Sequence, residues 1–148
     1  MRRISLFAAL ALLVVVGSSQ ARADDDEICF SPNSDDWKRQ DYLEPAMRAC
    51  SRLISSRTGA AQAAAYRARG YWRNRLNQFS TAIEDFNTAI RLDPKHIEGY
   101  NYRGDAWRDN GYLDNALADY DMATRIDPTF PAAYYNRGRV YEMKGDIA

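Results

Sequence analysis

The chain has 148 residues, with 20 basic and 20 acidic side chains, one histidine and two cysteines. This length suits one modest domain. The chain also lacks the net positive charge with which nucleic-acid-binding proteins neutralise phosphates. Nucleic acid is therefore excluded as the expected partner. One histidine and two cysteines are too few ligands for a closed zinc site, so we expect neither a metal nor a cofactor.

Residues 1–23 have the layout of a cleaved secretory signal. Arg2 and Arg3 precede an apolar run from Leu6 to Gly17, and Ala21-Arg22-Ala23 fits a cleavage site. A membrane anchor is the alternative, but a spanning helix needs roughly 20 apolar residues, and this run of 12 is shorter. We expect cleavage after Ala23, export to the periplasm or outside the cell, and no membrane partner afterwards. Loss of three arginines leaves 17 basic against 20 acidic residues, a charge of −3.

Residues 24–62 are expected to form an acidic tail followed by a capping helical segment. The run from Asp24 to Glu27 lacks the spaced ligands and turn glycine of a calcium loop, which favours a solvated tail. In an exported chain, Cys29 and Cys50 are expected to form a structural disulfide.

The capping segment is predicted from a pattern shared with a later helix. The pattern of residues 46–54 matches that of residues 82–90, and Pro45 suits the first turn of such a helix. Residues 55–62 are predicted to be the connection to the next helix, and residues 33–44 a short helix.

The remainder repeats one phrase three times. An aromatic residue followed by Arg-Gly recurs with Gly70, Gly104 and Gly138 spaced 34 residues apart. Apolar residues recur at helical steps of three and four on both sides of Gly111, which can end a helix in the left-handed conformation. Asp127-Pro128 stops the second helix. The unit is therefore a hairpin of two helices, in which the small residues permit a close approach.

This pattern resembles the tetratricopeptide-repeat family. The matching residues, with counterparts 34 positions away, are Tyr100, Gly104, Trp107, Gly111, Ala116, Tyr120, Ala123 and Pro128. The resemblance covers residues 63–148 and implies an all-α fold, a solenoid of antiparallel helix hairpins with an N-terminal, disulfide-tied half repeat. It places repeat 1 at 63–96, repeat 2 at 97–130 and a partial repeat 3, with its first helix only, at 131–148.

The sequence departs from the family at the residue before each helical glycine. The family usually has a large aliphatic residue there, whereas this chain has Arg69, Arg103 and Arg137. Acids recur as Asp85 and Asp119. We predict that each arginine reaches an aspartate of the second helix in its own or the adjoining unit; the alternative is that it extends to water.

No catalytic constellation is present in the sequence. The histidine, His96, follows Pro94 between two helix pairs, with no nucleophile beside it. We therefore expect a binding protein and not an enzyme. A stack of hairpins offers a concave groove for a protein or peptide, and the resemblance implies that the first helix of each unit lines it. The expected lining residues are Arg67, Tyr71, Asn74, Arg75, Glu98, Asn101, Asp105, Arg108, Tyr135, Arg139 and Glu142.

Two readings of this face remain open: a partner-binding groove or an ordinary solvated helix face. A carboxylate clamp of the kind some family members use is not expected, because only Arg67 resembles its residues. The alternative function is structural, with the chain as the N-terminal part of a longer, truncated repeat array. In that case the uncovered last helix could mediate self-association.

Overall fold

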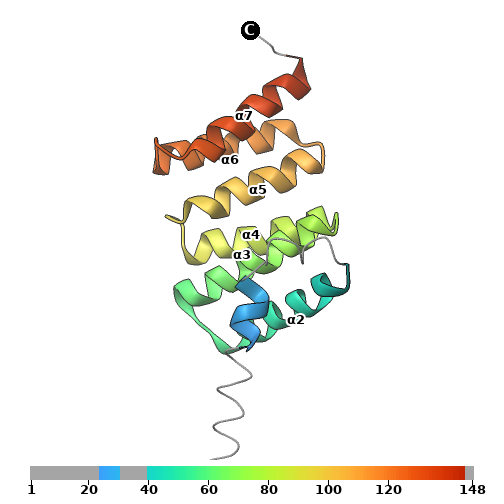
Figure 1. The fold of residues 1–148 in the computed structure, drawn as a ribbon. Helices are drawn as coiled ribbons and strands as arrows, with labels where there is room; N and C mark the ends of the chain where they lie inside the picture. Colours follow the sequence, from blue (N-terminus) through green and yellow to red (C-terminus); the bar gives the residue numbers. More distant parts are fainter. Residues whose placement is uncertain (1–23, 31–39, 146–148) are drawn as a thin grey trace, which may run out of the picture.

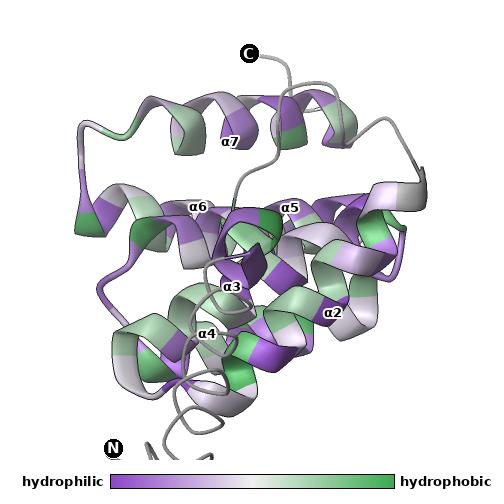
Figure 2. Ribbon diagram, turned by 60° about the horizontal axis from the view of Figure 1, so that its bottom comes forward, coloured by the Kyte–Doolittle hydropathy of each residue, from purple (hydrophilic) through white to green (hydrophobic). Residues whose placement is uncertain are grey.

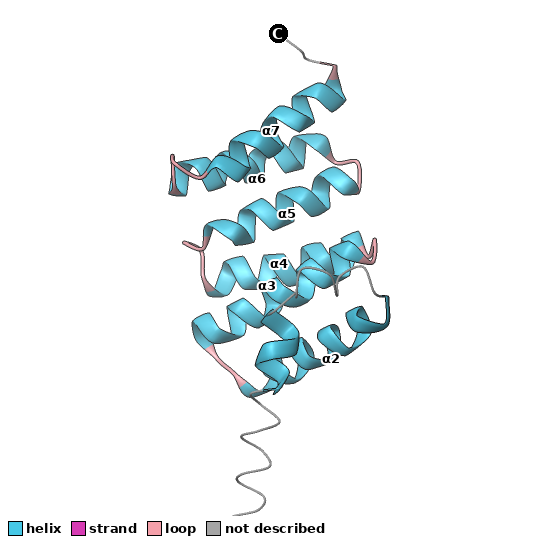
Figure 3. Ribbon diagram, viewed as in Figure 1, coloured by secondary structure: helices cyan, strands magenta, loops and turns pink. Residues whose placement is uncertain are grey.

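The computed structural model describes residues 24–30 and 40–145, and these residues form helices joined by short turns (Figure 3). The predicted signal sequence, part of the predicted helix at 33–44 and the last three residues lie outside the described residues. A helical segment at 24–30 comes first. The labelled helices are α2 (Gln40–Ser56), α3 (Gly59–Arg75), α4 (Phe79–Leu92), α5 (Ile97–Asp109), α6 (Leu113–Ile126) and α7 (Pro131–Lys144).

The helices stack in chain order from α2 to α7 (Figure 1). Each helix contacts the next one along the chain, and α5 also contacts both α3 and α7. The expected all-α solenoid of helix hairpins is therefore confirmed. The pairs α3–α4 and α5–α6 are the two complete hairpins, and α7 packs on the second of them.

The hairpin turns follow the predicted 34-residue spacing. Asn77, Gly111 and Gly145 all adopt positive φ angles, of 59°, 86° and 78°. Glycine and asparagine tolerate this left-handed conformation, which ends a helix while keeping its last carbonyl groups hydrogen-bonded. The turn after each first helix is thus marked by one residue that tolerates a positive φ angle, asparagine at 77 and glycine at 111 and 145.

The helices of a hairpin pack through a glycine and an aromatic ring. A Cβ atom at Gly70 would lie 2.8 Å from the ring of Phe86, and one at Gly104 would lie 2.6 Å from the ring of Tyr120. Both rings are fully buried. Close packing leaves no room for a methyl group there, so the repeated glycines are required by the rings opposite them.

Two predicted boundaries near the N-terminus are wrong. Pro45 lies inside α2 instead of in its first turn, because the preceding turn is held in place: Leu43 is buried and the Tyr42 ring packs edge-on against Trp72. The connection expected at residues 55–62 is also shorter, since α2 continues to Ser56 and α3 begins at Gly59. Alanines at residues 60, 61 and 63 favour this early start.

None of the described helices is long and apolar enough to span a membrane.

Candidate functional site

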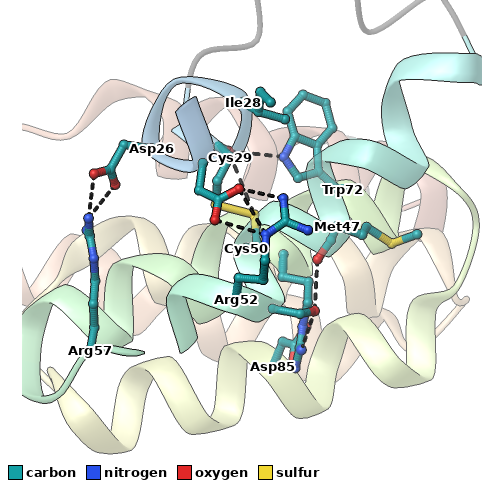
Figure 4. Close-up of a disulfide and its surroundings, with 12 residues drawn as sticks. Asp26, Ile28, Cys29, Met47, Cys50, Arg52, Arg57, Trp72 and Asp85 are labelled. Atoms are coloured by element: carbon teal, nitrogen blue, oxygen red, sulfur yellow. Dashed lines mark hydrogen bonds and ion pairs between the residues drawn. A yellow bond between two sulfur atoms is a disulfide. The ribbon is translucent and has the colours of Figure 1, made fainter. Parts of the chain in front are cut away.

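The helical segment 24–30 is fastened to α2, to α3 and to the turn between them by a disulfide and by hydrogen bonds, most of which are drawn in Figure 4. Cys29 and Cys50 are bonded, with their Cα atoms 5.1 Å apart, which confirms the predicted pairing. The carbonyl oxygen of Cys29 accepts a 3.1 Å hydrogen bond from the indole N–H of Trp72. Both residues are fully buried, so the segment forms part of the core.

The acidic run is not the solvated tail that the sequence suggested. Asp25 is buried and accepts hydrogen bonds from the guanidinium of Arg52, and Asp26 accepts from Arg57 (Figure 4). Two consecutive acids of this short helix therefore meet arginines, one at the C-terminal end of α2 and one just beyond it. The spacing within the run alone could not predict this contact, because both arginines are more than 25 residues away.

The repeated arginines bridge the helices, as predicted for the first two. Arg69 donates to both carboxylate oxygens of Asp85 (2.7 and 2.9 Å), and Arg103 does the same to Asp119 (2.6 and 2.8 Å). The remaining amino group of each arginine reaches the preceding second helix, at Ser51 and Asn87 respectively. Each guanidinium therefore ties three helices together.

The third arginine makes only the contact with the preceding second helix. Arg137 donates to Asp121 of α6 at 2.8 Å. Asp121 belongs to the adjoining unit, as the prediction allowed, but it is not one of the two aspartates expected. Burial raises the pKa of Asp119, with the hydrogen bond from Arg103 opposing that effect.

Two adjoining pockets lie between α3 and α5. The first has a volume of about 260 Å³ and is lined by Cys29, Phe30, Ala64, Arg67, Ala68, Tyr71, Trp72 and Tyr102. The second, about 130 Å³, is lined by Tyr71, Asn74, Arg75, Phe86, Tyr102, Asp105, Arg108 and Asp109. Tyr71 and Tyr102 belong to both, with ring centroids 5.7 Å apart. The two pockets therefore adjoin along the first helices of the hairpins, and together they are called the hollow.

The second pocket contains an ordered polar network. Asp105 accepts a 2.9 Å hydrogen bond from the hydroxyl of Tyr120 and a 2.8 Å bond from Arg108. Burial raises the pKa of Asp105, while the charge of Arg108 opposes the rise. Burial likewise raises the pKa of Tyr120, so the phenol stays a neutral donor.

Asn74 leaves one hydrogen-bonding atom unused in the same pocket. Its Nδ2 donates to Asp109 at 3.2 Å, but its buried Oδ1 has no hydrogen-bond partner among residues 24–30 and 40–145. Buried polar atoms are nearly always hydrogen-bonded, and an exception needs an explanation. Asn74 therefore places an acceptor without a partner among the described residues in the wall of the second pocket.

The structure brings six of the eleven predicted groove residues to these pockets: Arg67, Tyr71, Asn74, Arg75, Asp105 and Arg108. Asn101 is instead buried, where its Oδ1 accepts from Asn136 and links α5 to α7. Glu98 is partly exposed, with its carboxylate 2.8 Å from the imidazole of His96. Tyr135, Arg139 and Glu142 lie exposed on α7 and line neither pocket.

Sequence reasoning missed the aromatic part of the hollow. Phe30, Trp72 and Tyr102 were not among the residues expected to line the groove. Tyr102 follows Asn101 in the first helix of repeat 2, so a wider stripe along that helix would have included it. Phe30 lies outside the 34-residue repeat, and no signal in the sequence places it beside α3.

The outer face of α7 is uncovered. Tyr134, Tyr135, Tyr141 and Met143 are exposed, and a Cβ atom at Gly138 would meet nothing within 4 Å. Hydrophobic and hydrophilic residues are interleaved along α7 (Figure 2). This helix presents the same glycine as α3 and α5 but has no ring opposite it among the described residues.

Comparisons with known proteins agree with the geometry. Two family models match the chain, "Tetratricopeptide repeat" at residues 63–96 and "TPR repeat" at residues 104–145. No sequence among curated proteins matches it.

Solved tetratricopeptide-repeat domains share the fold. The first such domain of human RPAP3 has a TM-score of 0.70 at 17% identity, covering 85% of this chain and 91% of that one. The second RPAP3 domain, solved with the HSP70 peptide SGPTIEEVD, has a TM-score of 0.63 at 20% identity, covering 70% and 85%. The first domain of Spaghetti (RPAP3), bound to the HSP90 peptide SRMEEVD, has a TM-score of 0.67 at 19% identity, covering 86% and 95%.

The fold and the repeated contacts define an α-helical repeat protein with a hollow along the first helices of its hairpins. The chain belongs to the tetratricopeptide-repeat family.

Proposed function

We propose that the protein is a non-catalytic scaffold that holds a peptide or an extended segment of another protein in the hollow between α3 and α5. The main supporting observation is the pair of adjoining pockets that share Tyr71 and Tyr102, with Asn74, whose Oδ1 has no partner among the described residues, in the wall of the second. Apolar walls with a few placed polar groups are typical of ligand sites. Relatives with this fold are solved with bound peptides, which supports a peptide as the class of ligand.

The chemistry of the site favours binding over catalysis. The described residues contain no cluster of histidine, cysteine or acidic residues that could hold a metal ion. The carboxylate of Asp105 is already engaged by Tyr120 and Arg108. The polar groups thus shape the wall of the hollow and leave Asn74 to meet a ligand.

A peptide selection tests this function. A random peptide library displayed on phage would be panned against the oxidised protein, and the affinities of selected peptides measured by fluorescence anisotropy. We expect Asn74→Ala to weaken binding about fivefold to tenfold, because one hydrogen bond inside a ligand site is lost. Asn115→Ala, an exposed asparagine on α6, is the matched control. Failure to select any peptide, or equal affinity for both variants, would contradict the proposal.

We also propose that the protein is exported and works outside the cytoplasm. The support is the signal-like pattern of residues 1–23 together with the disulfide, a bond that persists in oxidising compartments. Mass spectrometry of the protein from fractionated cells is the test. We expect a mature chain beginning at Asp24 in the exported fraction; a full-length chain confined to the cytoplasm would contradict this.

Self-association through α7 is a second candidate function. The observation that favours it is the uncovered face with Tyr134, Tyr141 and the open Gly138. Sedimentation velocity at increasing concentrations would detect it, and a strictly monomeric protein would exclude it.

A further inference from the structure

The first pocket differs from the rest of the hollow because one of its walls is not part of the repeat. Cys29 and Phe30 come from the helical segment 24–30, whereas most of the other wall comes from α3. In Figure 1 the segment lies against the α2–α3 end of the stack, at the opposite end from α7. The N-terminal segment therefore helps to build a binding surface as well as covering the core.

This wall depends on bonds outside the segment. A helix of seven residues is far below the roughly 12 needed for marginal stability in water. Its position is set by the bond from Cys29 to Cys50, by the indole of Trp72 and by the hydroxyl of Tyr42, which donates to the carbonyl of Ile28. Phe30, next to the disulfide, is 38% exposed, so its ring is available on the surface that the disulfide fixes.

The interior of the pocket combines aromatic rings with one positive charge. Phe30, Tyr71, Trp72 and Tyr102 supply the rings, and Arg67 supplies the charge. Arg67 is partly buried and makes no hydrogen bond or ion pair with the described residues. Burial lowers the pKa of Arg67, with the negative charge of Glu98 opposing that effect. The guanidinium is thus partly desolvated and keeps its five donors for a ligand.

The size and charge of the pocket restrict what fits. At about 260 Å³, it lies below the roughly 300–1,000 Å³ of pockets that hold drug-sized molecules, so it suits one large side chain. Aromatic walls alone would also attract a cation, but Arg67 repels one. A carboxylate would pair with Arg67 through charge-assisted, bidentate hydrogen bonds.

We propose that this pocket is the anchor subsite for a peptide that presents a large apolar side chain next to a carboxylate, and that the Cys29–Cys50 disulfide assembles the subsite. The proposal rests on the proposed function and assigns the ligand chemistry of its first pocket. The apolar side chain enters between Phe30 and the tyrosines, and the carboxylate meets Arg67. The backbone then continues along the second pocket past Asn74.

The test uses peptides from the selection described above and matched derivatives. We expect the selected sequences to share an apolar residue adjacent to Asp or Glu. Changing that acid to its amide should weaken binding about tenfold to the wild-type protein, but change it less than twofold for Arg67→Gln, because the charged partner is gone. Arg91→Gln, an exposed arginine on α4 outside both pockets, should behave as wild type.

Two further measurements test whether the wall formed by Cys29 and Phe30 contributes to binding in the first pocket. Phe30→Ala keeps the disulfide and should lower affinity about tenfold for peptides with the large apolar residue, with little effect on their alanine derivatives. Reduction of the disulfide should have a similar effect, while hydrogen exchange shows α5 and α6 still protected.

The outcomes separate the two proposals. No selectable peptide would overturn both. Peptides that need Asn74 but are indifferent to Arg67→Gln, Phe30→Ala and reduction would overturn the anchor subsite and leave the proposed function standing.

Discussion

Arg103 donates two hydrogen bonds, of 2.6 and 2.8 Å, to the carboxylate of Asp119. Arg69 makes the same two-bond contact with Asp85 one repeat earlier. Asp119 is only 3% exposed, and Asp85 is equally buried. A carboxylate this deeply buried requires a partner, since an uncompensated charge is expensive away from water. The arginine that replaces the family's aliphatic residue is therefore explained by the acid on the facing helix.

Replacing Arg103 with Met should destabilise the protein by about 1 to 3 kcal/mol, because a buried acceptor is left unpaired. Arg137→Met should cost less than about 1 kcal/mol, since its partner Asp121 is 44% exposed and the pair is screened by water. Guanidinium denaturation of both variants would measure the difference. Equal midpoints for Arg103→Met and wild type would show that the arginine does not support the fold.

Gly104→Ala and Gly138→Ala should have opposite effects. An added Cβ at Gly104 would lie 2.6 Å from the ring of Tyr120, whereas at Gly138 it would meet nothing within 4 Å. We expect a loss of about 1 to 3 kcal/mol for the first from overpacking. The second should gain about 0.5 to 1 kcal/mol, because alanine is the better helix former. Thermal unfolding of the two variants gives the comparison, and equal destabilisation would contradict it.

The partly buried carboxyl group of Asp105 should make stability fall as pH rises. Its folded-state pKa is raised above the ordinary value of 3.8, mainly by burial, so the folded state binds the proton more tightly than the unfolded state does. The stabilisation is complete below pH 3.8 and is lost as pH rises through the raised pKa. Relative to Asp105→Asn, the wild-type protein should therefore lose stability as pH rises above 3.8, as measured by unfolding at each pH.

Asp127 provides a control, because its contribution to stability should change with pH in the opposite direction. Hydrogen bonds from the side chain and backbone of Thr129 lower its pKa, so its contribution is present above pH 3.8 and is lost as pH falls through the lowered value. The difference between wild type and Asp127→Asn should slope the other way. Parallel slopes for the two aspartates would show that their environments do not differ as described.

Denatured, unreduced protein from the exported fraction should contain no free thiol, because its only cysteines are bonded to each other. The bond closes a loop with a sequence separation of 21, which the chain-entropy model values at about 3 kcal/mol. Reduction should lower the free energy of unfolding by about that amount. Thiol titration and denaturation with and without reductant would check both points, and two free thiols would refute the pairing.

The sequence predicted those parts of the molecule that follow the 34-residue period. The turns at Asn77 and Gly111, the close approach of the helices at the glycines and two of the arginine–aspartate pairs recur in register, so a single phrase specifies them. The rings that meet the glycines were not predicted, because the aromatic residues were expected to fill the space between neighbouring hairpins. Arg137 keeps the contact with the preceding second helix, because Asp121 stands 34 positions after Asn87, the residue that Arg103 contacts there.

The candidate site was predictable only in part for a related reason. Arg67, Asn74 and Asp105 follow from the helix face that the repeat defines. Phe30 does not, because its position depends on the disulfide and on the docking of a segment with no counterpart in the repeats. Likewise, Asn101 was expected in the groove from its spacing, yet its contact with Asn136 depends on how α7 packs against α5.

A designed helix appended after Ala148 should stabilise the C-terminal end of the stack. The two complete hairpins specify its sequence: an aspartate 16 positions after Arg137, followed at once by an aromatic residue, as Asp119 and Tyr120 follow Arg103. This residue pair would meet Arg137 and fill the space over Gly138, and it would cover Tyr141. Repeat units gain stability from their neighbours, so we expect a higher denaturation midpoint and stronger hydrogen-exchange protection of α7. Light scattering should also show less association at high concentration, because the uncovered face is then occupied.

An appended helix of the same length with serine in place of that aspartate and aromatic residue is the control. If both extensions protect α7 equally, the aspartate and the aromatic residue are not the cause of the added stability.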